Sequence, residues 1–269
     1  MVAGMAAQER ELREKAVQFV REGDVLIERG RLIEAIERYR AAAELDSGNP
    51  HYRTRLADAY AYADQAPQAA AEYERAIELD PNYAEAHFGL GELFFNHGRI
   101  KAAIHYFARA VRLNPRKAWY HYRLSQAYIQ AGKLEKAERA LKRAIRLMPD
   151  SFYLFRLGDL YLQMRRLDEA ARALELACAR APWDEYYHAC LGLVRWRAGD
   201  MRGALEALSK AASLRPEMPS YRYLLAEALM AAGEVERAKE QFQQASSLDE
   251  YDRDFIRRLK AWAGLEVKL

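Results

Sequence analysis

The sequence predicts an all-α fold made of one helix pair repeated along the chain. Glycine (14 of 269 residues) and proline (8) are scarce, and few segments alternate β-branched and polar residues as strands do. Prolines recur at intervals of 33 or 34 residues: Pro81, Pro115, Pro149, Pro182 and Pro216. Two alanines stand twelve and five positions before each of these prolines. A period of this length indicates an array of stacked helical units.

The paired alanines extend through seven units: Ala35 and Ala42, Ala69 and Ala76, Ala103 and Ala110, Ala137 and Ala144, Ala170 and Ala177, Ala204 and Ala211, Ala238 and Ala245. Between the two alanines stands a bulkier residue: Tyr39, Tyr73, Phe107, Leu141, Leu174, Leu208, Phe242. A small residue recurs upstream: Gly23, Ala57, Gly91, Ser125, Gly158, Gly192, Ala226. Small residues suit places where two helices approach closely, and the large residues fill the space beside them.

Each unit is expected to hold two helices. The first carries apolar residues at helical spacing, such as Leu90, Leu93 and Phe94. A glycine or polar break then ends it: Gly30, Asp64, Gly98, Gly132, Arg165, Gly199, Gly233. Glycine suits this place because it adopts the left-handed conformation that closes a helix. The second helix ends at a stop such as Leu79–Pro81, and neither helix can bury its apolar stripe without a neighbour.

This register resembles the tetratricopeptide repeat (TPR) family over residues 16–252. The resemblance implies an all-α, right-handed superhelical solenoid of antiparallel helix pairs. It places seven repeats at 16–49, 50–83, 84–117, 118–150, 151–184, 185–218 and 219–252. Residues 1–15 are expected to form an N-terminal helical extension or a frayed tail. Residues 253–269 are similar to the family's C-terminal capping helix, with Phe255, Ile256, Leu259 and Trp262 as its apolar stripe and Arg253, Asp254, Arg257, Arg258 and Lys260 facing water.

Nothing in the sequence points to catalysis, so we expect a protein that is not an enzyme and that holds no cofactor or metal. Phosphate-binding glycine loops, Gly-x-Ser-x-Gly and His-Glu-x-x-His are absent from the sequence. His87, His121 and His188 share one repeat position and are interpreted as packing residues. Cys178 and Cys190, the only two cysteines, are interpreted as buried thiols.

Charge and hydropathy favour a cytoplasmic protein. The chain contains no run of 18 uncharged apolar residues, so no membrane span is expected. Charged residues lie between Glu9 and Lys15, where a secretory signal would need an apolar core.

In TPR arrays the first helices form the concave wall, mainly through their second, fifth, sixth, ninth, twelfth and thirteenth residues. Carried over, these positions predict a partner-binding groove that is rich in aromatic residues, as interfaces are. Its candidates are Phe88, Phe95, Trp119, Tyr122, Arg123, Phe152, Phe155, Arg156, Tyr186, Trp196 and Tyr223. The alternative is that these side chains pack between adjacent first helices. The family's carboxylate clamp is disfavoured, because the ninth positions include Asp24, Asp58, Glu92, Asp159 and Glu227, which would repel a carboxylate.

A basic band is the second candidate surface. Residues 101–146 hold twelve lysines and arginines against Glu135 and Glu138, a net charge of +10 in a chain whose net charge is +3. Much of the band falls on expected second helices, hence on the convex side: Arg109, Arg112, Lys136, Arg139, Lys142, Arg143, Arg146. A solvated face is one interpretation, and an acidic protein or anionic surface is the other. Nucleic acid is less favoured, because single-strand binders interleave aromatics with cations.

The sequence therefore predicts a non-enzymatic protein–protein interaction scaffold that binds a peptide or helix of another protein in its concave groove. Two alternatives stay open: a nucleic-acid-binding helical repeat that uses residues 101–146, and a self-assembling TPR scaffold. The identity of the partner is not encoded in any motif.

Overall fold

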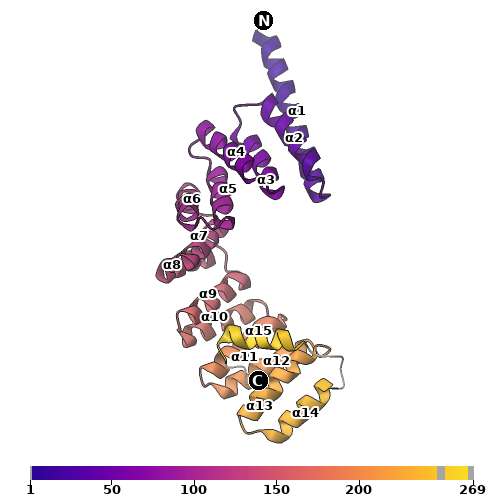
Figure 1. Cartoon of the computed structure of the whole chain (residues 1–269), viewed down its shortest axis with the longest axis vertical. Helices are drawn as coiled ribbons and strands as arrows, with labels where there is room; N and C mark the ends of the chain where they lie inside the picture. Colours follow the sequence, from indigo (N-terminus) through magenta and orange to yellow (C-terminus); the bar gives the residue numbers. More distant parts are fainter. Residues whose placement is uncertain (1, 247–251, 266–269) are drawn as a thin grey trace. The chain divides into compact units, whose positions relative to one another are not determined.

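The computed structural model describes residues 2–246 and 252–265, and all regular structure within these ranges is α-helical. The predicted all-α class is confirmed. The described helices are α1 (Val2–Glu28), α2 (Leu32–Leu45), α3 (Pro50–Tyr62), α4 (Ala66–Leu79), α5 (Ala84–Asn96), α6 (Ile100–Leu113), α7 (Ala118–Gln130), α8 (Leu134–Leu147), α9 (Ser151–Gln163), α10 (Leu167–Arg180), α11 (Glu185–Arg197), α12 (Met201–Leu214), α13 (Pro219–Ala231), α14 (Val235–Ser246) and α15 (Arg253–Ala263) (Figure 1).

The chain divides into two compact units, Met1–Ala140 (unit 1) and Leu141–Leu269 (unit 2), with the division inside α8. In unit 1 the packed pairs are α1/α2, α3/α4 and α5/α6, and α2, α4 and α6 each contact the next first helix. In unit 2 the pairs are α9/α10, α11/α12 and α13/α14, with α10 and α12 contacting the next first helix. This is the stacked-pair arrangement that the 33–34-residue period indicates.

The turn inside each repeat follows the predicted break positions. All seven have a positive φ, from 56° at Asp64 to 85° at Gly199. Five are glycines, which enter this region without strain. Asp64 and Arg165 carry a side chain there, which costs free energy for an L-residue.

The paired alanines form the contact layer between helices. All fourteen have at most 1% of their surface exposed. The small residue upstream is required by the bulky one: a Cβ added at Gly91 would lie 2.5 Å from the Phe107 ring, and one added at Gly192 would lie 2.6 Å from Leu208. Close packing of this kind fixes the spacing of the two helices in a repeat.

The two ends of the array differ. At the N-terminal end, α1 begins at Val2, so the segment before repeat 1 continues its first helix. At the C-terminal end, α15 packs against α11 and α13, the first helices of repeats 6 and 7 (Figure 1). The apolar stripe is partly as expected, since Ile256 and Leu259 are buried. The expectation that Lys260 faces water is wrong, because its ammonium group donates to Glu227 of α13 and only 9% of the residue is exposed.

Among the described helices none is both long and apolar enough to cross a lipid bilayer.

Candidate functional site

The first helices of unit 1 surround an open cavity. Residues of α3, α5 and α7, together with Tyr73 of α4, enclose a volume of about 480 Å³, and we call this surface the inner wall of unit 1. Its lining consists of Thr54, Asp58, Ala61, Tyr62, Tyr73, Glu85, Phe88, Gly89, Glu92, Asn96, Trp119 and Tyr120. Glu85, Phe88, Gly89, Glu92, Asn96 and Trp119 stand at positions that the family resemblance assigns to the concave wall.

Aromatic side chains form much of this wall. Phe88 stacks on Tyr120 with ring centroids 4.5 Å apart, and Trp119 lies 5.1 Å from Tyr122. Tyr62 and Trp119 present their surfaces to solvent, with 70% and 43% exposed. Phe88 and Tyr120 therefore form a packed base, and Tyr62 and Trp119 offer apolar surface to a ligand.

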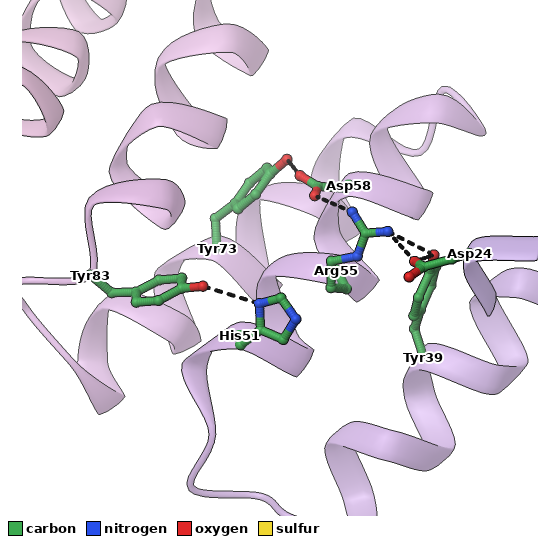
Figure 2. Close-up of polar contacts among 7 residues, drawn as sticks. All are labelled: Asp24, Tyr39, His51, Arg55, Asp58, Tyr73 and Tyr83. Atoms are coloured by element: carbon green, nitrogen blue, oxygen red, sulfur yellow. Dashed lines mark hydrogen bonds and ion pairs between the residues drawn. The ribbon is translucent and has the colours of Figure 1, made fainter. Parts of the chain in front are cut away.

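A polar network supports the wall from the side of α1 and α3 (Figure 2). The Tyr39 hydroxyl donates to Asp24 Oδ1 at 2.7 Å, and the Tyr73 hydroxyl donates to Asp58 Oδ1 at 2.6 Å. Arg55 lies between the two carboxylates, donating to Asp24 and lying 3.8 Å from Asp58 Oδ2. Each tyrosine is fifteen residues beyond its aspartate, so the same contact repeats in repeats 1 and 2.

The pKa values of the two aspartates are shifted in opposite directions. Burial raises the pKa of Asp58, and the Tyr73 hydrogen bond and the Arg55 charge offset only part of that effect. Burial acts in the same sense on Asp24, but there hydrogen bonds from Tyr39 and Arg55 outweigh it and lower the pKa. In repeat 3 burial raises the pKa of Glu92, against the opposing effect of Arg123. For Asp58 and Glu92, which line the cavity, the hydrogen bonds and nearby charges therefore offset only part of the cost of desolvation.

The inner wall of unit 2, formed by α9, α11 and α13, is covered by α15. The Trp262 ring stacks on Phe155 at 5.7 Å with an interplanar angle of 17°. Phe255 meets Tyr221 edge-on at 5.7 Å. Tyr186, Phe255, Arg258, Leu259 and Trp262 line a remaining cavity of about 300 Å³ between α11 and α15.

Three polar contacts fix α15 on this wall. Trp262 Nε1 donates to Asp159 Oδ1 at 3.0 Å, and Lys260 Nζ donates to Glu227 Oε2 at 3.0 Å. Arg197 Nη1 donates to the Ala263 carbonyl oxygen at 2.9 Å, at the end of the helix. Asp159 and Glu227 are ninth-position carboxylates, which would repel a carboxylate ligand. In this structure Asp159 accepts from the indole N–H of Trp262, and Glu227 accepts from the ammonium group of Lys260.

The candidate groove residues fall into both units. Phe88, Phe95, Trp119, Tyr122 and Arg123 belong to unit 1, and Phe152, Phe155, Arg156, Tyr186, Trp196 and Tyr223 belong to unit 2. Arg123 Nε donates to Glu92 at 2.5 Å, and its guanidinium lies 4.7 Å from the Phe95 ring centroid. Arg156 lies 3.7 Å from Asp159. Both arginines therefore bind carboxylates of their own wall.

The remaining candidates differ in exposure. Tyr122 is buried, whereas Phe152 is 39% exposed and Trp196 is half-buried. Phe155 contacts Tyr186 and Tyr187 as well as Trp262, and Tyr223 contacts Phe242. Whether any of them contacts a partner stays a prediction.

The seven residues of the basic band that were expected on the convex side lie on α6 and α8. Arg112, Lys136, Arg139, Lys142, Arg143 and Arg146 are exposed, and Arg109 is half-buried. Two of them have contacts that hold the fold: Arg109 Nη2 donates to Asn82 Oδ1 at 3.1 Å, and Lys142 Nζ lies 5.8 Å from the Tyr161 ring centroid.

The three equivalent histidines hold the turns between repeats. Nε2 of His87 lies 3.0 Å from the carbonyl oxygen of Pro81, and His121 and His188 contact Pro115 and Pro182 in the same way. Cys178 and Cys190 are both buried free thiols, and burial raises the pKa of Cys178 to about 12. No cluster of three or more potential metal ligands occurs within the described part of the chain.

Sequence reasoning missed the donors to the ninth-position carboxylates. Tyr39 and Tyr73 stand in the series of bulky core residues, and they carry hydroxyl groups that the two phenylalanines and three leucines of later repeats lack. A tyrosine fifteen residues after an aspartate, in two successive repeats, was the available signal. Thr54 and Tyr62 stand at the fifth and thirteenth positions of repeat 2, so the wall positions of the family resemblance were the available signal, but candidates were taken only from repeats 3–7.

Several solved structures resemble this chain. The pilF protein of Pseudomonas aeruginosa aligns with a TM-score of 0.63 and 20% identity over 82% of this chain and 99% of its own. YrrB, described as a TPR protein with an unusual peptide-binding site, gives 0.58 and 23% over 72% and 97%. MamA gives 0.54 and 26% over 62% and 92%. A search of curated proteins found no significant match.

The family comparison covers nearly the whole chain. The model of the cilia and flagella-associated protein 70 C-terminal domain, a TPR domain, matches residues 2–258. Fifteen described helices in repeating pairs agree with that match. The chain therefore belongs to this family of tetratricopeptide repeat domains.

Proposed function

We propose that this protein is a non-enzymatic interaction scaffold and that the inner wall of unit 1 binds a peptide or helix of a partner protein. The TPR fold supports protein interaction in general. The observation that carries the proposal is the contrast between an open 480 Å³ cavity with exposed aromatic rims in unit 1 and a wall already covered by a helix in unit 2.

The wall of unit 1 has the properties that an interface requires. Its base is rigid, because Phe88 is held between Phe107 and Tyr120 and Asp58 is hydrogen-bonded by Tyr73. Exposed rings cost little to order on binding and carry much of the energy of protein interfaces. A preformed surface of this kind needs no chemical step to select a partner.

Comparative pull-downs test the proposal. The tagged chain is compared with Trp119→Ala and Tyr62→Ala, which truncate the exposed rings of the inner wall, and with Trp183→Ala as a control. Trp183 is 77% exposed and lies outside both inner walls, beside Lys210 of α12. We expect a set of proteins whose recovery falls with both wall variants and is unchanged by the control.

The melting temperatures of the same variants show whether a loss of binding is caused by a loss of folding. Because Tyr62 is mostly exposed, its truncation should leave stability unchanged within about 0.5 kcal/mol. Equal recovery of every protein by all four chains would contradict the proposed function. The proposal would also be contradicted if recovery fell in proportion to the melting temperature of each variant, whether or not the substitution lies in the inner wall.

A further inference from the structure

Unit 2 shows which kind of segment the inner wall of these repeats holds. Helix α15 is amphipathic, with a buried stripe that includes Ile256 and Leu259 and a cationic face that includes Arg257 and Arg258. It is fixed by an aromatic ring against a fifth-position phenylalanine and by N–H donors to ninth-position carboxylates. The wall therefore recognises apolar surface and hydrogen-bond donors, one of them cationic, in a single helix.

Unit 1 presents the same residue types at the same repeat positions. Phe155 and Asp159, which hold Trp262, correspond to Phe88 and Glu92 two repeats earlier in the sequence. Phe88 and Glu92 both line the open cavity. The cavity also contains Asp58, which is the ninth-position carboxylate of repeat 2.

The charge of this cavity is negative. Its lining contains three carboxylates, Asp58, Glu85 and Glu92, and no lysine or arginine among the described lining residues. Asp58 and Glu92 have partners in Tyr73 and Arg123, whereas Glu85 is exposed and forms no ion pair within residues 2–246 and 252–265. A cation at this site would gain Coulomb energy mainly from Glu85, because Arg55 and Arg123 offset part of the charge of Asp58 and Glu92.

Exposed aromatic rings in the lining also favour a cation. Tyr62 and Trp119 add exposed ring faces, to which cations are attracted by the quadrupole of the ring.

We infer that the inner wall of unit 1 binds a basic amphipathic helix of another protein, with a lysine or arginine beside Glu85 and an apolar side chain against Trp119. The inference rests on the proposed function and specifies the chemistry of the partner. An acidic helix would meet the carboxylate of Glu85 and the partly offset ones of Asp58 and Glu92, so these charges disfavour it.

A synthetic peptide with the sequence of residues 252–265 serves as the basic probe, and the intact chain is the receptor. The control peptide carries Arg257→Glu, Arg258→Glu and Lys260→Glu, which keep the apolar stripe and reverse the charge. Binding is followed by fluorescence anisotropy of the labelled peptide. We expect saturable binding of the basic peptide that weakens as salt is raised, and no binding of the control.

Receptor variants locate the site. Glu85→Gln and Tyr62→Ala change exposed side chains, so the fold should survive both, and each should weaken binding roughly five- to tenfold. Asp159→Asn and Glu227→Gln in unit 2 weaken the hold on α15 and serve as matched controls. Affinity unchanged by the unit 1 variants, or raised by the unit 2 variants, would place the peptide on unit 2 and overturn the inference.

The two peptides separate failure of the inference from failure of the proposed function. Tighter binding of the acidic control, still sensitive to Tyr62→Ala, would overturn the basic specificity and leave the groove function standing. Binding of neither peptide would overturn the inference, and the pull-down with Trp119→Ala would still test the function. Concentration-dependent dimerisation of the chain that is lost with Trp262→Ala would identify a second copy as the occupant instead.

Discussion

Unit 1 and unit 2 are built from the same repeat, but their ninth-position carboxylates have different donors. In unit 1 the donors come from the repeats themselves: Tyr39, Tyr73 and Arg123. In unit 2 the hydrogen-bond donors come from α15, through Trp262 and Lys260, and Asp159 has in addition an ion pair with Arg156 of its own wall. The residue fifteen positions after the carboxylate accounts for part of this difference, because Leu174 and Phe242 have no hydroxyl group where Tyr39 and Tyr73 have one. Glu92 has Phe107 at that position and takes its donor from Arg123.

Whether a repeat wall is covered by another helix depends on where its carboxylates find hydrogen-bond donors. A half-buried carboxylate needs hydrogen bonds, and a wall whose repeats do not supply them is stabilised by an added helix. A wall that satisfies its own carboxylates can remain exposed to solvent and available to a partner. In repeats 1 and 2 a tyrosine at one core position supplies the donor, and in repeat 3 Arg123 supplies it.

The largest expected effect is on the covered wall. Trp262→Ala removes the stacking on Phe155 and leaves Asp159 without the indole N–H, so unit 2 should lose about 3 kcal/mol of stability. Hydrogen exchange should accelerate in α11 and α13 and stay unchanged in α3 and α5. Trp183→Ala is the control with a matched residue type. Equal acceleration in both units would show that the walls do not differ in this way.

A second effect concerns the internal donors of unit 1. Tyr73→Phe leaves Asp58 without its hydroxyl donor and should cost about 1–2 kcal/mol in urea unfolding. Tyr39→Phe should cost less, because Arg55 still donates to Asp24. Tyr62→Phe, at an exposed ring, is the control. If Tyr39→Phe proved the more costly of the two, the donor assignment would be wrong.

The pH dependence of stability should differ in sign between the two aspartates of unit 1. The pKa of Asp58 is raised in the folded chain, so the folded state binds more protons there, and this residue's contribution to stability falls as pH rises from the ordinary value near 3.8 through the raised one. The pKa of Asp24 is lowered, so its contribution is present above the ordinary value and is lost as pH falls through the lowered one.

Asp58→Asn and Asp24→Asn measure these contributions. As pH rises from the ordinary value of an aspartate through the raised pKa of Asp58, the free energy of unfolding of the unmodified chain should fall relative to that of Asp58→Asn. As pH rises from the lowered pKa of Asp24 to the ordinary value, the free energy of unfolding of the unmodified chain should rise relative to that of Asp24→Asn. Denaturant unfolding at a series of pH values gives both. Parallel slopes for the two variants would contradict the assignment.

The smallest effect is expected at the turns. Arg165→Gly in unit 2 should stabilise the chain by up to about 1 kcal/mol, because φ is 59° and glycine adopts that region freely. Asp64→Gly in unit 1 should gain less, since aspartate tolerates the left-handed region better than arginine does. Thermal unfolding of both variants measures the difference, and Gly132→Ala, at a third turn, should destabilise.

Much of the fold could be predicted from the sequence. The alanine pairs, the breaks from Gly30 to Gly233 and the absence of strand patterns each report local geometry, and a period repeated seven times makes a local signal unambiguous. The position of α15 could not be predicted in the same way. Its amphipathic stripe shows that it covers something, but its choice of wall depends on contacts such as Trp262 with Asp159, which are 103 residues apart.

The candidate site was predictable in part. Repeat positions led to Phe88 and Trp119, which line the cavity of unit 1. They also suggested ligand-binding roles for Arg123 and Arg156, which stay predictions; what the positions did not indicate is that these side chains bind Glu92 and Asp159. A single sequence does not reveal which neighbouring carboxylate takes an arginine, because that depends on how adjacent first helices are rotated.

Photo-cross-linking tests the central claim, that the wall of unit 1 is open and the wall of unit 2 is covered, most directly. The peptide of residues 252–265 is made with benzoylphenylalanine in place of Trp262, bound to the intact chain and irradiated, and the modified residues are found by mass spectrometry. The account predicts adducts on Tyr62, Phe88 or Trp119. Adducts on Phe155 or Tyr186 would contradict it, because the wall of unit 2 would then be the one that admits a helix.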